Sequence, residues 1–143
     1  MNNSQSHLAP PHAVLTNTIA ASPQIQVRDL PAIAAAGFTA VMNNRPDGES
    51  MDQPSSEELR VAAQALGIEY HYCPVDGFNY PGDKLAEIAA VFADTEKPVF
   101  AFCRSGTRSA NLWINTRPAE EQDAARRHAQ ELGFDISMSL SVR

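Results

Sequence analysis

The sequence predicts an α/β protein, with a single domain and a mainly parallel central sheet flanked by helices. The chain has 143 residues, a length typical of one domain. Short apolar segments alternate with amphipathic segments of about a dozen residues, the pattern of strands joined by crossover helices. One apolar segment, Pro98–Phe102 (PVFAF), shows no polar alternation, which indicates a strand buried on both faces of a sheet.

Composition and charge exclude several classes of protein. Hydrophobic residues make up 43% of the chain and charged residues 20%, which excludes a largely disordered protein. The net charge of -6 argues against a nucleic-acid partner. No segment approaches the roughly 18 apolar residues of a membrane span, so we expect no membrane partner.

The N-terminal residues and the two cysteines bear on the cellular location of the protein and on its disulfide and metal sites. Residues 1–12 are polar and are expected to form a flexible tail, which leaves residues 13–143 as the domain. The tail has no features of a secretory signal, so we expect a cytoplasmic protein. Cys73 and Cys103 are too few for a disulfide framework or a four-cysteine zinc site. No cluster of side chains has metal-ligand spacing, and we expect neither a metal nor a cofactor.

The first part of the domain predicts strands around one helix. Val14–Ala21 is expected to give one or two short strands. Gln26–Ala36 predicts a helix, because Gly37 follows as a natural C-terminal cap. Phe38–Met42 predicts the next strand. Asn43–Asp52 is rich in turn residues and predicts a loop.

The next helix has the clearest start, because Ser55 and Glu58 stand at the spacing of a capping box. Its apolar face repeats at helical spacing through Leu59, Ala62, Ala63 and Leu66. Gly67 is expected to end this helix. Ile68–Val75 then predicts a strand that Pro74 weakens at its end. Asp76–Asp83 predicts a second polar loop.

The remaining elements complete the alternation. A helix is expected from Leu85 to Phe92, followed by the buried strand Pro98–Phe102. Ser109–Asn115 also predicts a helix, in which Trp113 is expected to pack on the sheet. A last long helix is expected between Pro118 and Gly133. Phe134–Arg143 predicts a short turn or helix.

The candidate site is the six-residue loop Cys103–Arg108 (CRSGTR), between the buried strand and a helix. Ligands of open α/β sheets bind at the carboxyl ends of the strands. A loop that opens a helix directs several backbone N–H groups at one point, which favours an anion and a cysteine thiolate. Arg108 can hold two oxygens of a phosphate-like group. The other candidate anion-binding residues are Arg104, Ser105, Gly106, Thr107 and Ser109, whose hydroxyl could donate to the thiolate.

Both cysteines also have a plainer interpretation as buried core residues. For Cys103 we favour an anion-binding thiolate, because two arginines and a glycine follow within five positions. For Cys73 we favour the core interpretation over a role as a redox partner of Cys103.

The loop resembles the active-site loops of two enzyme superfamilies. Protein tyrosine and dual-specificity phosphatases carry C-x5-R, usually after a histidine. Rhodanese-type sulfurtransferases carry a six-residue loop that begins with cysteine. Here the spacing is C-x4-R, and Phe102 stands in place of the histidine. The loop length is similar to that of the sulfurtransferases, whereas Arg108 followed by Ser109 is similar to the phosphatases.

From about Leu15 to Asp135 the chain resembles the bacterial beta-lactamase hydrolase-like proteins in their phosphatase-like domain, a family also labelled sulfur transferase. The matching segments are Ser22–Gln24, Ala34–Phe38, Asn44–Glu49 and Cys103–Trp113. The resemblance implies a protein-tyrosine-phosphatase-like fold. It also suggests a partner enzyme in sulfur metabolism.

A phosphatase needs a nucleophile, an anion-binding loop and a general acid. Cys103 would be the nucleophile, and Arg108 with the loop amides would bind the anion. By comparison with the phosphatases, Asp76 is the first candidate for the acid. Asp83 and Asp47 are alternatives, although Asp83 also fits a helix N-cap. Arg45 could extend the anion site, brace the loop or form a surface ion pair.

Three hypotheses for function remain open. The first is a cysteine-dependent phosphatase that acts through a phosphocysteine on an anionic small molecule or a phosphoprotein. The second is a sulfurtransferase that carries a persulfide on Cys103 and needs no general acid. The third is an inactive, anion-binding accessory domain.

Overall fold

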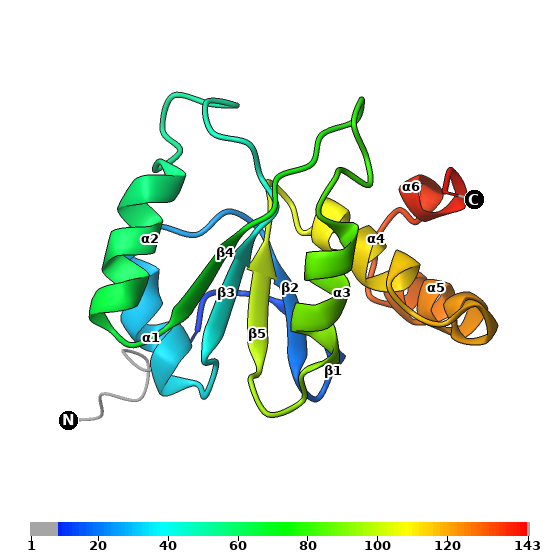
Figure 1. Cartoon of the computed structure of the whole chain (residues 1–143), viewed down its shortest axis with the longest axis horizontal. Coiled ribbons are helices and arrows are strands. Elements are labelled where there is room, and N and C mark those ends of the chain that lie inside the picture. The colour runs from blue at the N-terminus through cyan, green and yellow to red at the C-terminus, as the bar shows by residue number, and fades with distance from the viewer. Residues whose placement is uncertain (1–8, 143) are drawn as a thin grey trace.

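A computed structural model describes residues 9–142 as a five-stranded sheet covered by helices on both faces (Figure 1). The strands are β1 (Ala13–Thr16), β2 (Ile19–Ser22), β3 (Ala40–Asn43), β4 (Glu69–Tyr72) and β5 (Val99–Phe102). Their order across the sheet is β1-β2-β5-β3-β4. Only β1 pairs antiparallel, with β2, and the other pairs are parallel. The predicted single α/β domain with a mainly parallel sheet is therefore confirmed.

The helices divide between the two faces of the sheet (Figure 1). One face carries η2 (Val27–Asp29), α1 (Leu30–Ala35) and α2 (Ser56–Ala65). The other elements are α3 (Leu85–Ala93), α4 (Thr107–Asn115), η3 (Ala119–Glu121), α5 (Gln122–Glu131) and α6 (Ser137–Leu140). Among the described residues, no helix is long and apolar enough to cross a membrane.

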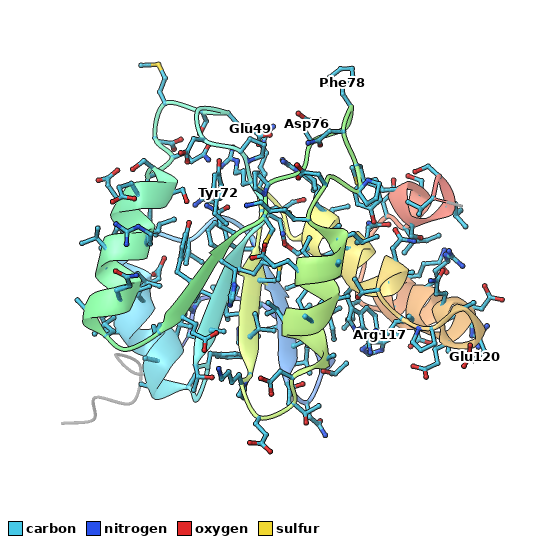
Figure 2. All side chains as sticks on the ribbon, in the orientation of Figure 1. Glu49, Tyr72, Asp76, Phe78, Arg117 and Glu120 are labelled. Atoms are coloured by element: carbon cyan, nitrogen blue, oxygen red, sulfur yellow. The ribbon has the colours of Figure 1, made fainter. Side chains whose placement is uncertain are left out.

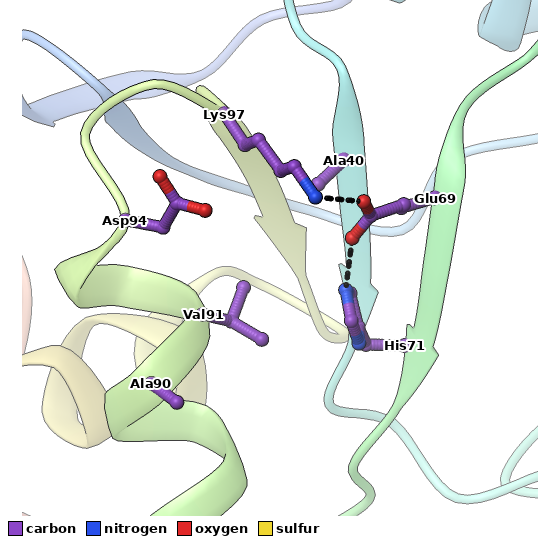
Figure 3. A pocket seen from close by; sticks show the side chains of 7 residues that line it. All are labelled: Ala40, Glu69, His71, Ala90, Val91, Asp94 and Lys97. Atoms are coloured by element: carbon purple, nitrogen blue, oxygen red, sulfur yellow. Dashed lines mark hydrogen bonds and ion pairs between the residues drawn. The ribbon is translucent and has the colours of Figure 1, made fainter.

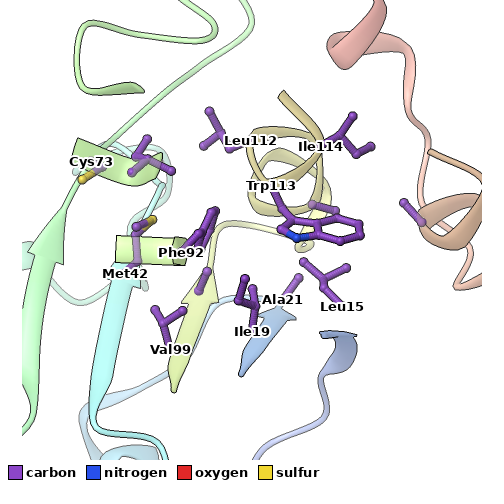
Figure 4. Close-up of a cluster of buried hydrophobic side chains, with 14 of the residues drawn as sticks. Leu15, Ile19, Ala21, Met42, Cys73, Phe92, Val99, Leu112, Trp113 and Ile114 are labelled. Atoms are coloured by element: carbon purple, nitrogen blue, oxygen red, sulfur yellow. The ribbon is translucent and has the colours of Figure 1, made fainter. Parts of the chain in front are cut away.

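The central strand β5 supplies both halves of the core, because successive side chains of a strand point to opposite faces. Phe100 and Phe102 are fully buried in the cluster that contains residues of α1 and α2. Ala101 belongs to the second cluster, with residues of α3 and α4. Trp113 packs α4 onto this cluster, as predicted (Figure 4). The strand is thus buried on both faces, as its unbroken apolar sequence predicts.

The local signals of the sequence act as expected at the start of α2. Ser55 Oγ accepts a hydrogen bond from the Glu58 N–H at 3.1 Å, and Glu58 Oε1 accepts one from the Ser55 N–H at 3.0 Å. This capping box satisfies two backbone donors that the first helical turn leaves free.

Some predictions differ from the structure or extend beyond it, and the helix and strand bounds above differ from the predicted ones by a few residues. The helix after Cys103 begins at Thr107, two residues before the predicted start at Ser109. Asp83 does not cap α3, since the residue at the N-cap is Lys84. Residues 1–8 of the predicted tail lie outside the described residues, whereas the exposed His12 lies edge-on to the Phe100 ring at 5.3 Å.

The register of the sheet places two polar residues beside the end of β5. Phe102 is aligned with Ser22 of β2 on one side and with Asn43 of β3 on the other. Because these strands are parallel, their carboxyl ends meet at one edge. Cys103 follows Phe102 directly and therefore lies at the centre of that edge, where ligands of open α/β sheets bind.

Candidate active site

The loop between β5 and α4 bends around the sulfur of Cys103. The Gly106 N–H donates a hydrogen bond to Cys103 Sγ at 3.1 Å. The Cys103 N–H donates to the Ser22 carbonyl at 3.3 Å, which fixes the start of the loop on β2. The sulfur, which is nearly buried, therefore lies in front of the amino end of α4. Backbone N–H groups and the helix dipole at this position stabilise negative charge.

Gly106 is the residue that allows this bend. It lies at the N-cap of α4 with a φ of 92°, in the left-handed region that glycine adopts at little cost. A Cβ here would lie 3.2 Å from Phe134 Cε1 and 3.4 Å from the carbonyl carbon of Ser22. The backbone conformation therefore favours glycine, and a Cβ would also require the Phe134 ring to shift slightly.

Arg108 stands on the first turn of α4 and is held in a fixed orientation. Its Nη1 donates to Glu49 Oε2 at 2.9 Å and to the Val75 carbonyl at 2.8 Å, and Nη2 donates to Glu49 Oε1 at 2.9 Å. Burial acts to lower the pKa of Arg108, but the bond to Glu49 and the neighbouring Cys103 and Asp76 raise it overall. The guanidinium thus stays charged beside Cys103.

Glu49 joins this arginine to a second one. Its Oε1 also accepts a hydrogen bond from Arg45 Nε at 2.9 Å. The hydrogen bond from Arg108, together with that from Arg45 and against the effect of burial, lowers the pKa of Glu49 from its ordinary value. One ionised carboxylate therefore sets the relative position of two guanidinium groups.

Arg45 braces the loop rather than forming an exposed ion pair. It is 5% exposed, and its Nη1 donates to Gln24 Oε1 at 3.0 Å. Gln24 in turn donates its backbone N–H to the Arg104 carbonyl at 3.3 Å. Of the alternatives predicted for Arg45, the surface ion pair is wrong, because Arg45 is buried just after the end of β3.

The Ser109 hydroxyl does not donate to the Cys103 thiolate, as the sequence predicts, but to a different residue. It donates to Asn44 Oδ1 at 2.8 Å, so this bond uses its only proton. Asn44 also donates through Nδ2 to the Cys73 carbonyl at 2.9 Å. Ser109 and Asn44 are both fully buried, and they tie α4 to the ends of β3 and β4.

The other loop residues predicted to bind an anion are placed around its rim. Arg104 and Ser105 are exposed, and Ser105 Oγ donates to Thr107 Oγ1 at 3.0 Å. Thr107 begins α4 and is partly exposed. The side chains of this part of the loop are thus open to solvent above the buried Cys103.

Three aspartates were candidates for a general acid, and their surroundings differ. Asp76 follows Val75, whose carbonyl binds Arg108, so its loop lies next to the site. Figure 2 places Asp76 and Glu49 at the same edge of the molecule. Asp76 Oδ1 accepts from the N–H groups of Phe78 and Asn79 at 2.7 and 2.9 Å, which leaves Oδ2 without a hydrogen-bond partner among the described residues.

The two alternatives have less suitable positions. Asp47 Oδ1 accepts from the Ser56 N–H at 2.8 Å, so this carboxylate caps the start of α2. Asp83 is exposed at the start of α3. Asp76, by contrast, follows the residue whose carbonyl accepts from Arg108, and its charge helps to raise the pKa of Arg108.

Cys73 lies in the core cluster with its sulfur 3.7 Å from Glu87 Oε2. Burial, and then the charge of Glu87, raise the pKa of the Cys73 thiol to about 12. Nearby on β4, His71 shares Glu69 with Lys97 in a small pocket against α3 (Figure 3). Across residues 9–142, no three His, Cys, Asp or Glu side chains form a group that could hold a metal ion.

Sequence reasoning missed Glu49, Asn44 and Gln24, which hold the loop and its arginines. Two of these residues lie in Asn44–Glu49, a segment that matches the family. The turn residues of this segment predict a loop but indicate no role for these two side chains. Their contacts join positions 59 and 65 residues apart in the chain, and no local spacing indicates such contacts.

Comparisons with known proteins identify the family and support the fold. The family model described as "Beta-lactamase hydrolase-like protein, phosphatase-like domain" matches residues 12–119. A curated relative, "Beta-lactamase hydrolase-like protein" from Agrobacterium fabrum, is 38% identical over 97 residues, which cover 68% of this chain and 22% of that protein. The chain thus spans less than a quarter of that relative's length.

Solved structures are similar over most of the chain. A candidate phosphatase from Neisseria meningitidis superposes with a TM-score of 0.73 at 30% identity, over 86% of this chain and 89% of the other. Tk-PTP, solved in its active form, superposes with a TM-score of 0.70 at 20% identity, over 92% of each chain. The second likeness shows the fold alone.

Proposed function

The chain belongs to the family of the beta-lactamase hydrolase-like protein, phosphatase-like domain, and on that premise we propose that it hydrolyses phosphate esters with Cys103 as the nucleophile. The observation that carries the proposal is that a cysteine sulfur and an arginine lie together at the end of β5. The Gly106 N–H reaches Cys103 Sγ, and Arg108 is held charged on the following helical turn. A thiolate and an oxyanion both suit this position.

In the proposed reaction, Cys103 Sγ attacks the phosphorus atom and the bond to the ester oxygen breaks, which gives a phosphocysteine and an alcohol or phenol. Loop N–H groups and Arg108 stabilise the charge on the phosphoryl oxygens. Arg108 has Nε and a second Nη2 hydrogen free for this purpose, because Glu49 and Val75 occupy the rest of its fork. Water then attacks the phosphocysteine and releases phosphate.

Asp76 is the proposed general acid for the leaving oxygen. Its Oδ2 is free among the described residues, and the adjacent Val75 carbonyl fixes its loop against Arg108. The same group, once deprotonated, would accept a proton from the attacking water.

The test is hydrolysis of p-nitrophenyl phosphate by the wild type and by Cys103→Ser, measured between about pH 5 and 8. We expect activity that the substitution abolishes. Equal rates for both proteins would contradict the proposal. Asp76→Asn keeps an oxygen that can accept from Phe78 and Asn79, so the turn should persist. This variant should lose more activity on phenyl phosphate than on p-nitrophenyl phosphate, whose leaving group needs less protonation.

A sulfurtransferase that carries a persulfide on Cys103 is the second candidate. One observation favours it: the spacing from Cys103 to Arg108 is C-x4-R, so the loop length is similar to that of the sulfurtransferases, and sulfur transfer needs no acid. In that case the Cys103 thiolate would attack the outer sulfur of thiosulfate, the S–S bond would break to release sulfite, and a persulfide would remain on Cys103. Asp76→Asn would leave the transfer rate unchanged.

A further inference from the structure

A cleft of about 310 Å³ lies beside the candidate active site, and we call it the side cleft. It is lined by Gln24, Gln26, Arg45, Ser50, Asp52 and Arg104. Arg104 follows Cys103 directly in the loop, and the Gln24 N–H binds the Arg104 carbonyl. The side cleft therefore shares a wall with the Cys103 loop. Its volume falls at the lower end of the roughly 300–1,000 Å³ typical of small-molecule sites.

Arg45 gives the side cleft a donor that the protein does not use. Its Nε binds Glu49 and its Nη1 binds Gln24, but Nη2 has no hydrogen-bond partner within residues 9–142. Over the same residues, the fully buried side-chain nitrogens without a partner belong to Trp113 and Arg117. Nη2 of Arg45 therefore keeps some contact with solvent, although only 5% of the residue is exposed. A guanidinium so deeply buried favours an acceptor at that open position.

The charges of the lining select an anion over a cation. Arg45 and Arg104 face one carboxylate, Asp52, whose Oδ1 already accepts from Ser50 Oγ at 2.7 Å. The lining itself carries two positive charges and one negative charge in a chain whose net charge is -6, while Glu49 outside the lining is shared between Arg45 and Arg108. Glutamine side chains supply further neutral donors to such a site.

Glu49 connects the side cleft to the Cys103 loop. The same oxygen, Oε1, accepts from Arg45 Nε and from Arg108 Nη2, each at 2.9 Å. The two guanidinium groups are thus held at a constant separation, one beside the thiol and one in the cleft. A molecule that carries two oxyanions could bind both guanidinium groups at once, and the arginines would not need to move.

Resting on the proposed function, we infer that the side cleft binds a second oxyanion of the substrate. The preferred substrate is then a phosphate ester that also carries a phosphate or a carboxylate group. Arg108 and the loop amides hold the phosphate that reacts, while Arg45 and Arg104 hold the group that does not.

Binding is tested by titration calorimetry with probes that the enzyme cannot hydrolyse. Methylphosphonate measures the Cys103 loop alone. Alkane bisphosphonates and phosphonocarboxylates with linkers of increasing length measure both sites together, and the two series separate a phosphate from a carboxylate. At one linker length we expect an affinity about tenfold or more above that of methylphosphonate, the gain for one charge-assisted pair of hydrogen bonds.

The ratio of the two affinities is then measured in three variants. Arg104→Gln should remove most of the gain, and Asp52→Asn should increase it. Arg127→Gln makes the same change of charge at an exposed position of α5 and should leave the ratio as in the wild type. No gain at any linker length, or a gain that persists in Arg104→Gln, would overturn the inference.

A failure of the inference remains distinct from a failure of the proposed function. Bisphosphonate affinity does not depend on turnover, whereas the proposed function fails when Cys103→Ser hydrolyses p-nitrophenyl phosphate as fast as the wild type. A wild type that hydrolyses this ester but binds all probes equally would keep the proposed function and reject the second oxyanion site.

Discussion

Glu49 shows how one side chain can organise a site without being an obvious catalytic residue. Its two oxygens accept three hydrogen bonds from the guanidinium groups of Arg45 and Arg108. Like-charged arginines repel each other, and a shared carboxylate removes that cost while fixing both orientations. We therefore regard Glu49 as a positioning residue for Arg108.

Glu49→Gln is expected to reduce kcat/KM on p-nitrophenyl phosphate by at least about tenfold, because a neutral amide holds Arg108 less firmly than a charge-assisted pair. Glu57→Gln is the matched control, since Glu57 pairs with Arg60 on the exposed side of α2. A Glu49→Gln enzyme with wild-type kinetics would contradict the positioning role.

The same residue predicts a pH dependence of stability. The folded-state pKa of Glu49 is lowered, mainly by the bond from Arg108, so its pairing stabilises the fold above the unfolded-state pKa. This contribution is lost as the pH falls from about 4.5 through the folded-state value. The difference in unfolding free energy between wild type and Glu49→Gln, from urea titrations, should therefore shrink below about pH 4.5. A difference that is constant with pH would be inconsistent with this pairing.

The two cysteines should differ in reactivity. Burial raises the pKa of Cys73 to about 12, so almost none of it is thiolate at neutral pH. Iodoacetamide should therefore leave Cys73 of the folded protein unmodified, so that any alkylation of the native wild type falls on Cys103 and is absent in native Cys103→Ser over the same period. Peptide mass spectrometry identifies the modified residue. Rapid labelling of Cys73 in the folded protein would show that it is accessible and ionised.

At the scale of elements, the decisive feature is the start of α4. Gly106 adopts a positive φ, and α4 begins at Thr107 immediately afterwards. This early start places Arg108 on the helix itself, whose orientation is fixed by buried residues. An arginine on a flexible loop would lose more side-chain entropy on binding an anion.

Gly106→Ala is expected to destabilise the protein by about 1–2 kcal/mol from the left-handed backbone alone, with a further cost mainly from the 3.2 Å contact with Phe134. Activity should fall as the N–H moves away from Cys103. Gly67→Ala is the matched control, since Gly67 also has a positive φ but open space around it. Urea unfolding should show a larger loss for Gly106→Ala, and equal losses would argue against the role of Phe134 and Ser22.

The elements themselves were predictable because their signals are local. Ser55 and Glu58 mark the start of α2, and the apolar run before Cys103 marks the buried strand. The start of α4 was placed two residues late, because Thr107 and Arg108 carry no apolar pattern and the glycine cap precedes them. Asp83 was assigned a capping role from its residue type, but one more residue separates it from the helix.

At the scale of the whole molecule, sheet order decides which loops meet. The order β1-β2-β5-β3-β4 brings the ends of β2 and β3 to either side of Cys103, which allows Gln24 and Glu49 to reach the same loop. The sequence predicted the strands but not their order. For that reason Cys103 and Arg108 could be named in advance, whereas Glu49 and Asn44 could not.

Family membership and fold agree with a phosphatase-like protein of negative net charge, in which Arg108 lies beside Cys103 and shares Glu49 with Arg45. In such a protein the positive charge at the site is local. Under the proposed function this charge attracts an anionic substrate at short range, and added salt should weaken the attraction because the Debye length at physiological ionic strength is only about 8 Å.

The most direct test of the central claim is detection of the covalent intermediate on Cys103. The wild type is mixed with p-nitrophenyl phosphate, quenched with acid during turnover and digested for mass spectrometry. The account predicts one phosphoryl group on the peptide that contains Cys103, absent in Cys103→Ser and more abundant in Asp76→Asn, where hydrolysis of the intermediate is slower. Steady turnover with no phosphoryl group on Cys103 in either protein would contradict it.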